Sequence, residues 1–137
     1  MSILQNKAEI NLDSAELLHN KGYYFPVAHC SYYACYQLIK HLWLHKLDKS
    51  EEELSALCKE KKGEGSHEVL INQIGLYIKN SSNKNKIDDF RVFNLNVLAL
   101  KKLRVKADYK DIGFDSTDSS NAISLSKDVI PLLKKYQ

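Results

Sequence analysis

Apolar residues recur at helical spacing along almost the whole chain, and the alternating pattern of a β-strand is nearly absent. The densest stretch, residues 23–47, carries two apolar rows at intervals of three and four residues. One row is typical of a surface helix, whereas two rows require packing partners on both sides. Pro26 is compatible with a first helical turn, where its missing N–H would have no partner. The pattern predicts a buried helix at the centre of a helical bundle.

Residues 3–20 are predicted to form a helix that packs along this central one. Their apolar positions come close to a seven-residue repeat, which suits one helix face packed against a neighbour. The positions that we expect on that face are Ile3, Ala8, Ile10, Ala15, Leu17 and Leu18. Gly22 then supplies the left-handed conformation that commonly follows a helix end.

Two further helices are predicted in the middle of the chain. Ser50, followed by three glutamates, is typical of a helix start and begins a short helix that ends near Lys61. The next helix begins at Ser66 and ends near Lys79. The polar stretch at residues 80–86 is predicted to be an exposed loop.

A long helix should follow, with Asp88 or Asp89 as its cap and its end at Ala107 or Tyr109. The row expected to be buried is Val92, Leu95, Leu98 or Ala99, and Leu103. Lysine and arginine side chains gather in its last turns, where cations complement the exposed carbonyls.

Residues 111–120 are rich in Asp, Ser and Gly and predict a loop. Ser119 or Ser120 should begin a last helix that ends at Lys135, with a bend near Asp128 or a break ahead of Pro131. The fold class is therefore all-α, a single domain over residues 1–137. We expect an up-and-down bundle of four to five helices with one additional short helix.

Composition narrows the class of protein. The 137 residues suffice for one core without disulfides or metals. Cys30, Cys35 and Cys58 are an odd number without a CxxC spacing, so we expect reduced thiols. Charges near the N-terminus exclude a signal peptide, and no stretch is apolar for long enough to span a membrane. We therefore expect a cytoplasmic protein with no membrane partner, and its net charge of +3 permits a polyanionic ligand without requiring one.

The strongest chemical signal is LRVKADY at residues 103–109. Arg104 and Asp108 are four residues apart and share a helix face, where they can form an ion pair. One interpretation is that this pair and Tyr109 only lock the helix end to the loop. The other is that they form a binding site, in which Arg104 contacts phosphate, Asp108 orients Arg104, and Tyr109 stacks or donates a hydrogen bond. Lys106 and His67 complete the candidate set.

The order of these parts resembles the HEPN domain of prokaryotic proteins. The resemblance extends from about Asp13 to the C-terminus and depends on Tyr32-Tyr33-Ala34, on the helix that starts at Ser66-His67, and on Arg104-x-x-x-Asp108-Tyr109. It implies a bundle of four or five helices that is often dimeric. It also implies a role related to nucleic acids: many members are RNases in toxin–antitoxin and antiphage systems, and others act beside a small nucleotidyltransferase.

Active RNases of that family place a histidine four to six residues after an arginine, and this chain departs from the pattern. The fifth residue after Arg104 is Tyr109, and no histidine follows His67. RNA cleavage through the ribose 2′-hydroxyl needs a group that exchanges a proton near neutral pH, as histidine does. His67 can supply that group only if the fold brings it beside Arg104.

Other candidates carry less. His41 and His45 have the spacing of a metal pair, but they lack a third ligand, so we predict no metal site and no cofactor. His29 and Cys30 are adjacent on a helix and point about 100 degrees apart, which argues against a catalytic pair. The tyrosines of the central helix can stack bases or form core, and we expect core for Tyr33 and Tyr36.

The leading hypothesis is a helical-bundle protein that binds RNA or a nucleotide, or a partner that does, without robust catalysis of its own. The first alternative is a metal-independent RNase toxin in which Arg104 acts with His67 or Tyr109. The second is a structural adaptor that pairs with a nucleotidyltransferase-type protein. A homodimer is expected in each case, and in the leading hypothesis the Arg104 guanidinium is offered to solvent.

Overall fold

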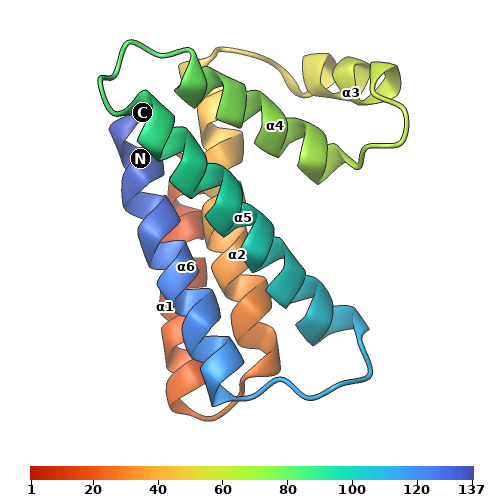
Figure 1. The fold of residues 1–137 in the computed structure, drawn as a ribbon, viewed down its shortest axis with the longest axis vertical. Helices are drawn as coiled ribbons and strands as arrows, with labels where there is room; N and C mark the ends of the chain where they lie inside the picture. Colours follow the sequence, from red (N-terminus) through yellow and green to blue (C-terminus); the bar gives the residue numbers. More distant parts are fainter.

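A computed structural model describes residues 1–137 and contains helices and no strand (Figure 1). This confirms the all-α prediction. The elements are α1 (Ile3–Asn20), α2 (Phe25–His41), the π-helical turn η1 (Leu42–Lys46), α3 (Glu51–Glu60), α4 (Ser66–Lys79), α5 (Lys86–Tyr109) and α6 (Ser116–Lys135).

Helix α2 is the central element, as its two apolar rows predicted. It packs against α1, α4, α5 and α6. Its side chains are buried on several faces, including Val27, Tyr32, Leu38 and Ile39. The helix continues into η1, where Trp43 is 1% exposed and its Nε1–H donates to the Ser50 carbonyl at 2.9 Å. A helix buried on this many sides forms the core to which the site helices attach.

Helix α1 has the predicted bounds but buries a different face. Ala8 and Ala15 are buried, whereas Ile3, Ile10 and Leu17 are 73%, 65% and 58% exposed. The prediction that all of these residues pack against α2 is therefore wrong for Ile3, Ile10 and Leu17. Residues two positions apart lie about 200 degrees apart around a helix, so a face that buries Ala8 turns Ile10 outward.

The start and the buried face of α5 also differ from the prediction. Its N-cap residue is Asn85, and neither Asp88 nor Asp89 caps it. Asp89 instead accepts hydrogen bonds from Tyr136 and Lys135. Between them, these contacts hold the start of α5 against the end of α6.

The buried row of α5 is Phe93, Val97 and Leu100, while Val92, Leu95 and Leu98 are 39%, 59% and 50% exposed. A Cβ on Gly75 of α4 would lie 3.3 Å from the Phe90 ring and 3.6 Å from the Phe93 ring. The two phenyl rings of α5 therefore pack directly on the α4 backbone. This packing selects a face rotated by one residue, about 100 degrees, from the predicted one.

Helix α6 begins at Ser116, earlier than predicted, because Asp115 and Asp118 form a capping box. It also continues through Pro131 without a break. Proline removes only one helical hydrogen bond, and the flanking Ile130 and Leu132 are both buried. Core packing on both sides therefore holds the helix together across the proline.

The helices are arranged so that three of them converge on one face. Figure 1 shows α1, α2 and α6 running side by side, with α5 crossing them diagonally and α4 and α3 to one side at the top. The three elements that meet on this face are the start of α4, the last turns of α5 and the middle of α2. None of the helices is both long enough and apolar enough to cross a membrane.

Candidate nucleic-acid interface

Arg104 near the end of α5 lies among three tyrosine rings. Its Cζ is 5.2 Å from the ring centroid of Tyr32, 5.5 Å from that of Tyr33 and 5.6 Å from that of Tyr109. A cation over an aromatic face is attracted by the ring quadrupole. Only 13% of the Arg104 side chain is exposed. The expectation of a guanidinium freely offered to solvent is therefore wrong, because α2 supplies two rings that cover it.

The hydrogen bonds of Arg104 leave part of the guanidinium free. Its Nε–H points to Asp108 Oδ2 at 3.4 Å and its Nη2 donates to the Tyr109 hydroxyl at 3.1 Å. Its Nη1 has no acceptor in the chain and is not among the buried unpartnered atoms, so it reaches solvent. Burial acts to lower the pKa of Arg104, but the hydrogen bond to Tyr109, the nearby Tyr33 and the hydrogen bond to Asp108 together outweigh burial and raise it. The side chain stays charged and keeps a donor for a ligand.

Asp108 is shared between two side chains, Arg104 and His29. Besides the Arg104 Nε–H, its Oδ2 lies 3.5 Å from His29 Nδ1. The His29 ring in turn packs on Tyr33, with 4.7 Å between the ring centroids. Asp108 orients Arg104, as the four-residue spacing suggested. The contact is long and uses only Nε, so other donors of the guanidinium are left.

His67, at the start of α4, is brought to the same tyrosines. Its Nδ1 lies 2.9 Å from the Tyr32 hydroxyl, and its ring stacks on Tyr36 with 4.0 Å between centroids. Burial and the nearby charges of Arg104, Lys101 and Lys40 lower the pKa of His67. It is therefore neutral at pH 7. His67 and Arg104 both contact Tyr32.

The two buried tyrosines of this group, Tyr32 and Tyr36, remain protonated. Burial raises the pKa of Tyr36 to about 12, and it raises that of Tyr32 further. Tyr32 and Tyr36 are 1% and 9% exposed, and Tyr33 is partly buried against the core. This placement confirms the core interpretation for Tyr36, while Tyr33 lies at the edge of the core and contacts Arg104.

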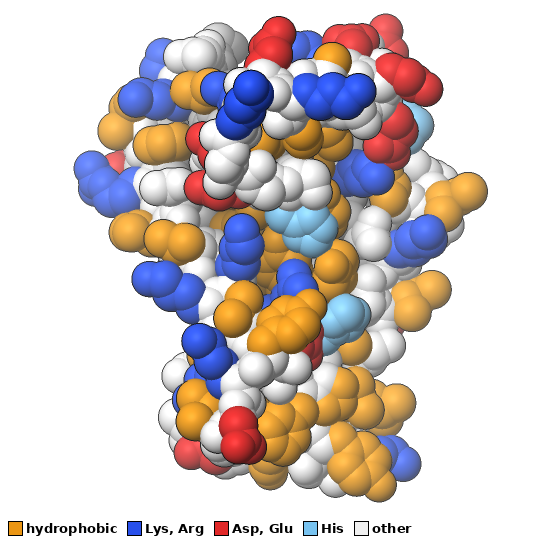
Figure 2. Space-filling view, turned by 90° about the vertical axis from the view of Figure 1, so that its right-hand side faces the viewer, with side chains coloured by type: hydrophobic (Ala, Val, Ile, Leu, Met, Phe, Trp, Pro, Cys, Tyr) orange, Lys and Arg blue, Asp and Glu red, His pale blue; other side chains and the backbone are white.

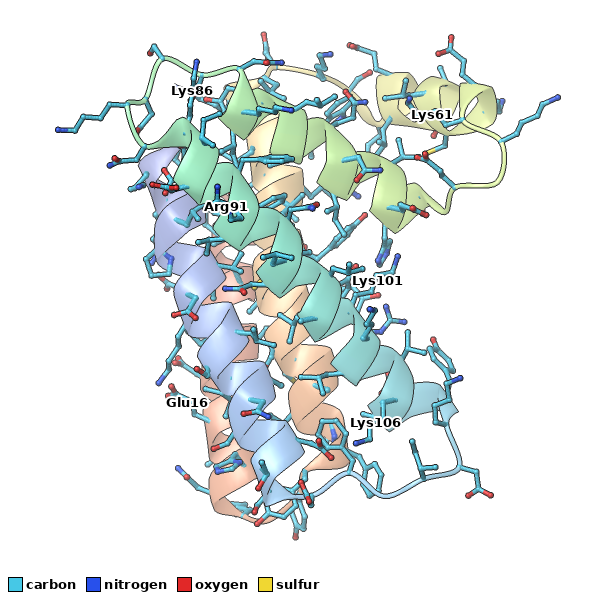
Figure 3. The ribbon with its side chains drawn as sticks, in the orientation of Figure 1. Glu16, Lys61, Lys86, Arg91, Lys101 and Lys106 are labelled. Carbon is cyan, nitrogen blue, oxygen red and sulfur yellow. The ribbon has the colours of Figure 1, made fainter.

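Positive charge exceeds negative charge around His67. Lys40 pairs with Glu51 at 2.8 Å, whereas Lys101 has no ion pair. Figure 2 shows histidine and basic side chains beside apolar ones in a hollow of this face. Figure 3 shows Lys101 extending from α5 on the side of α4. We call Arg104, Asp108, Tyr109, Tyr32, Tyr33, His67 and Lys101 the arginine cluster.

The structure separates Lys106 from this cluster. Its Nζ pairs with Asp118 at 2.9 Å and lies 5.9 Å from the centroid of the Phe114 ring, so it holds the loop ahead of α6. The site residues expected from the sequence did not include Lys101, and Tyr32 and Tyr33 were considered only as base-stacking or core residues of the central helix. Lys101 is three residues before Arg104 on the same helix, and that spacing was the available signal. The tyrosine contacts join α2 to α5, and no local spacing announces them.

Other candidate groups have structural partners. The rings of His41 and His45 lie 5.1 Å apart, and His41 Nδ1 is 2.8 Å from the Ser2 hydroxyl. No group of three or more His, Cys, Asp or Glu side chains could hold a metal ion. The three cysteines are free thiols, and burial raises the pKa of both Cys35 and Cys30.

Comparison with known proteins gave one match. The family model for the HEPN domain matches residues 1–136, essentially the whole chain. A search of curated proteins and a search of solved structures found no match.

Proposed function

The chain belongs to the HEPN family of helical-bundle domains, which is related to nucleotides and RNA, and we propose that its arginine cluster binds the phosphates of RNA or of a nucleotide without robust catalysis. The observation that carries this proposal is the free donor of Arg104. The guanidinium is clamped by three rings and Asp108, yet its Nη1 has no partner in the chain. A planar, pre-oriented guanidinium suits phosphate oxygens.

Neighbouring side chains supply the remaining contacts of such a site. Tyr109 is 70% exposed, so its ring can stack on a base while its hydroxyl holds Arg104. Lys101 adds a second, unpaired positive charge. Lys106, which is tied to Asp118, is assigned at most a distant electrostatic role.

Weak or absent catalysis follows from the state of the histidine. Its pKa is lowered, and its Nδ1 is engaged by Tyr32, so His67 is a poor proton acceptor compared with an imidazole that titrates at neutral pH. The position five residues after Arg104 is a tyrosine. Tyrosine exchanges protons poorly near pH 7.

The test is the affinity for a fluorescently labelled single-stranded RNA, measured by anisotropy at several salt concentrations. We expect Arg104→Ala to weaken binding strongly and Arg91→Ala to leave it unchanged. Arg91 is the matched control, because it is the other arginine of α5 and pairs with Asp88 at 3.7 Å on the exposed surface. Equal losses in both variants would mean that binding reflects net charge, and the site assignment would then be wrong.

A second candidate, a metal-independent RNase, is favoured by one contact: His67 and Arg104 both touch Tyr32. In that case His67 would take the proton of the ribose 2′-hydroxyl and Arg104 would stabilise the transition-state charge. Incubation of the protein with total RNA separates the two functions. Cleavage by the natural chain that disappears in both Arg104→Ala and His67→Gln would favour the RNase.

HEPN domains are often found in dimers, and we propose a homodimer for this chain as well. The exposed apolar rows of α1 (Ile3, Ile10, Leu17) and of α5 (Val92, Leu95, Leu98) are the surfaces that support it. Sedimentation of Ile10→Lys and Leu95→Lys would identify the row that is used. A role in a toxin–antitoxin or defence system and a nucleotidyltransferase-type partner stay predictions that derive from the family.

A further inference from the structure

A groove between α4 and α5 adjoins the arginine cluster. Its volume is about 440 Å³, within the range of small-molecule sites. Its walls carry Glu68 and Asn72 from α4 and Asn94, Leu98, Lys101 and Lys102 from α5. We propose that this groove binds an unpaired nucleobase of the same RNA or nucleotide whose phosphate Arg104 contacts. The inference rests on the proposed function and adds a base-reading subsite to it.

The groove is continuous with the cluster along both helices. On α5, Lys101 lines the groove and is three residues from Arg104, a rise of about 4.5 Å along the helix axis. On α4, Glu68 lines the groove and is adjacent to His67. The charge of Lys101 also acts on His67. One short ligand therefore reaches from the guanidinium into the groove.

The lining combines the chemical groups that a base requires. The partly buried Ile71 and the half-exposed Leu98 provide an apolar surface for the flat ring. Asn72 and Asn94 provide amides from opposite walls, and an amide pairs with two adjacent atoms of an adenine edge. The Glu68 carboxylate can accept from an exocyclic amino group.

Charge favours a nucleic acid over an apolar protein segment as the occupant. Lys101 and Lys102 have no ion-pair partner in the chain, and both line the groove. Free lysines beside an apolar floor suit a base with its phosphate attached. An apolar helix docked in the same place would have to desolvate both of them.

A neighbouring groove along α5 offers an internal control. A second groove, between α5 and α6, is lined by Lys102, Lys106 and Asn121. There Lys106 is already paired with Asp118, and no residue of the arginine cluster lines the groove. Asn72, Asn94 and Asn121 are all exposed helical residues. Replacing any of them by alanine raises helix propensity, so none of the variants should unfold.

The experiment compares two ligands, a short oligoadenylate and an abasic ribose-phosphate oligomer of equal length. The natural chain should bind the oligoadenylate more tightly. Asn94→Ala and Asn72→Ala should each lower oligoadenylate affinity about fivefold or more and leave abasic affinity unchanged. Asn121→Ala should change neither, and Arg104→Ala should weaken both ligands alike.

The possible outcomes separate the base subsite from the phosphate site. If the two ligands bind equally and Asn94→Ala has no effect while Arg104→Ala weakens both, the base subsite is wrong and the proposed function stands. If Arg104→Ala changes neither affinity, the proposed function is wrong. A base effect of Asn94→Ala that persisted in that case would support the groove alone, and its absence would overturn both assignments.

Discussion

The two ends of α5 hold equally buried charges that differ in how fully they are neutralised. Asp89 near the start and Arg104 near the end each expose 13% of the side chain. Asp89 accepts a hydrogen bond from Tyr136 at 2.7 Å and an ion pair from Lys135 at 2.8 Å. Arg104 has one carboxylate at 3.4 Å, which is shared with His29, and a free Nη1.

The comparison shows that burial alone does not identify a functional charge. The Asp89 carboxylate has two short contacts, both to Oδ2, and one of them comes from an oppositely charged side chain. The group formed by Asp89, Lys135 and Tyr136 therefore acts as a structural latch. A guanidinium held in place with a donor left over is pre-organised for an anion. The latch should therefore control stability and the arginine cluster should control binding.

The largest expected effect is on the latch. Asp89→Ala leaves a lysine and a hydroxyl without their acceptor and should lower the free energy of unfolding by about 2–3 kcal/mol in urea titration. Asp88→Ala, whose only ion pair is with exposed Arg91, should change it by less than about 0.5 kcal/mol. RNA affinity measured at a temperature where both variants are folded should not change, and a matching loss of affinity would contradict the division of roles.

The next effect is on the cluster. Arg104→Ala should reduce RNA affinity about tenfold or more, equivalent to about 1.4 kcal/mol, and lower the salt slope by about one. It should also cost about 1 kcal/mol of stability, because the tyrosine rings lose their cation. The RNA affinity of Arg104→Lys, which keeps the charge but not the planar fork, should lie between those of the natural chain and Arg104→Ala. A variant that lost stability and kept its affinity would reduce Arg104 to a structural residue.

A smaller effect is expected from Tyr136→Phe, about 1 kcal/mol of stability from one hydrogen bond. Burial acts to raise the pKa of Asp89, but the bonds from Lys135 and Tyr136 outweigh burial and lower it. The lowered pKa of this carboxyl stabilises the fold at pH values above the pKa that the group has in the unfolded chain. That stabilisation is lost as the pH falls through the pKa of the folded chain. Without the tyrosine hydroxyl the folded pKa rises, so acid unfolding should begin at higher pH. Unfolding curves from pH 7 down to pH 3 measure this.

The smallest effect concerns His67. Because the pKa of His67 is lowered in the folded chain, the unfolded chain binds a proton below about pH 6.5 before the folded chain does. Stability should therefore fall slightly as the pH drops. A bound phosphate would oppose the charges of Arg104, Lys101 and Lys40 and make protonation easier. RNA affinity should therefore rise about two- to threefold between pH 7.5 and pH 5.5. His67→Gln should abolish the rise, and a rise that persisted in this variant would place the titrating group elsewhere.

Two helix bounds followed from local chemistry, the end of α1 at a glycine and the start of α3 at a capping serine. Gly22 adopts a positive φ of 77° after α1, and the Ser50 hydroxyl accepts from the Glu53 N–H at the start of α3. The buried faces of α1 and α5 did not follow. In α1 the side that carries Ala8 and Ala15 is covered, and in α5 the side whose phenyl rings pack on Gly75 of α4 is covered. Contacts between helices therefore decided which side of each helix is buried.

The site divides in the same way. Arg104, Asp108 and Tyr109 lie within two turns of one helix, so their contacts were predictable from spacing. Tyr32 and His67 come from α2 and α4, and no spacing relates them to Arg104.

By itself, the sequence determined an all-helical bundle around α2 and an arginine with its own orienting carboxylate, because helical period and four-residue pairing are local. The tertiary structure alone decided that tyrosines cover the guanidinium, that His67 is held neutral beside it, and that a groove opens next to both. Those features depend on the close packing of α2, α4 and α5, which brings together residues that are far apart in the sequence.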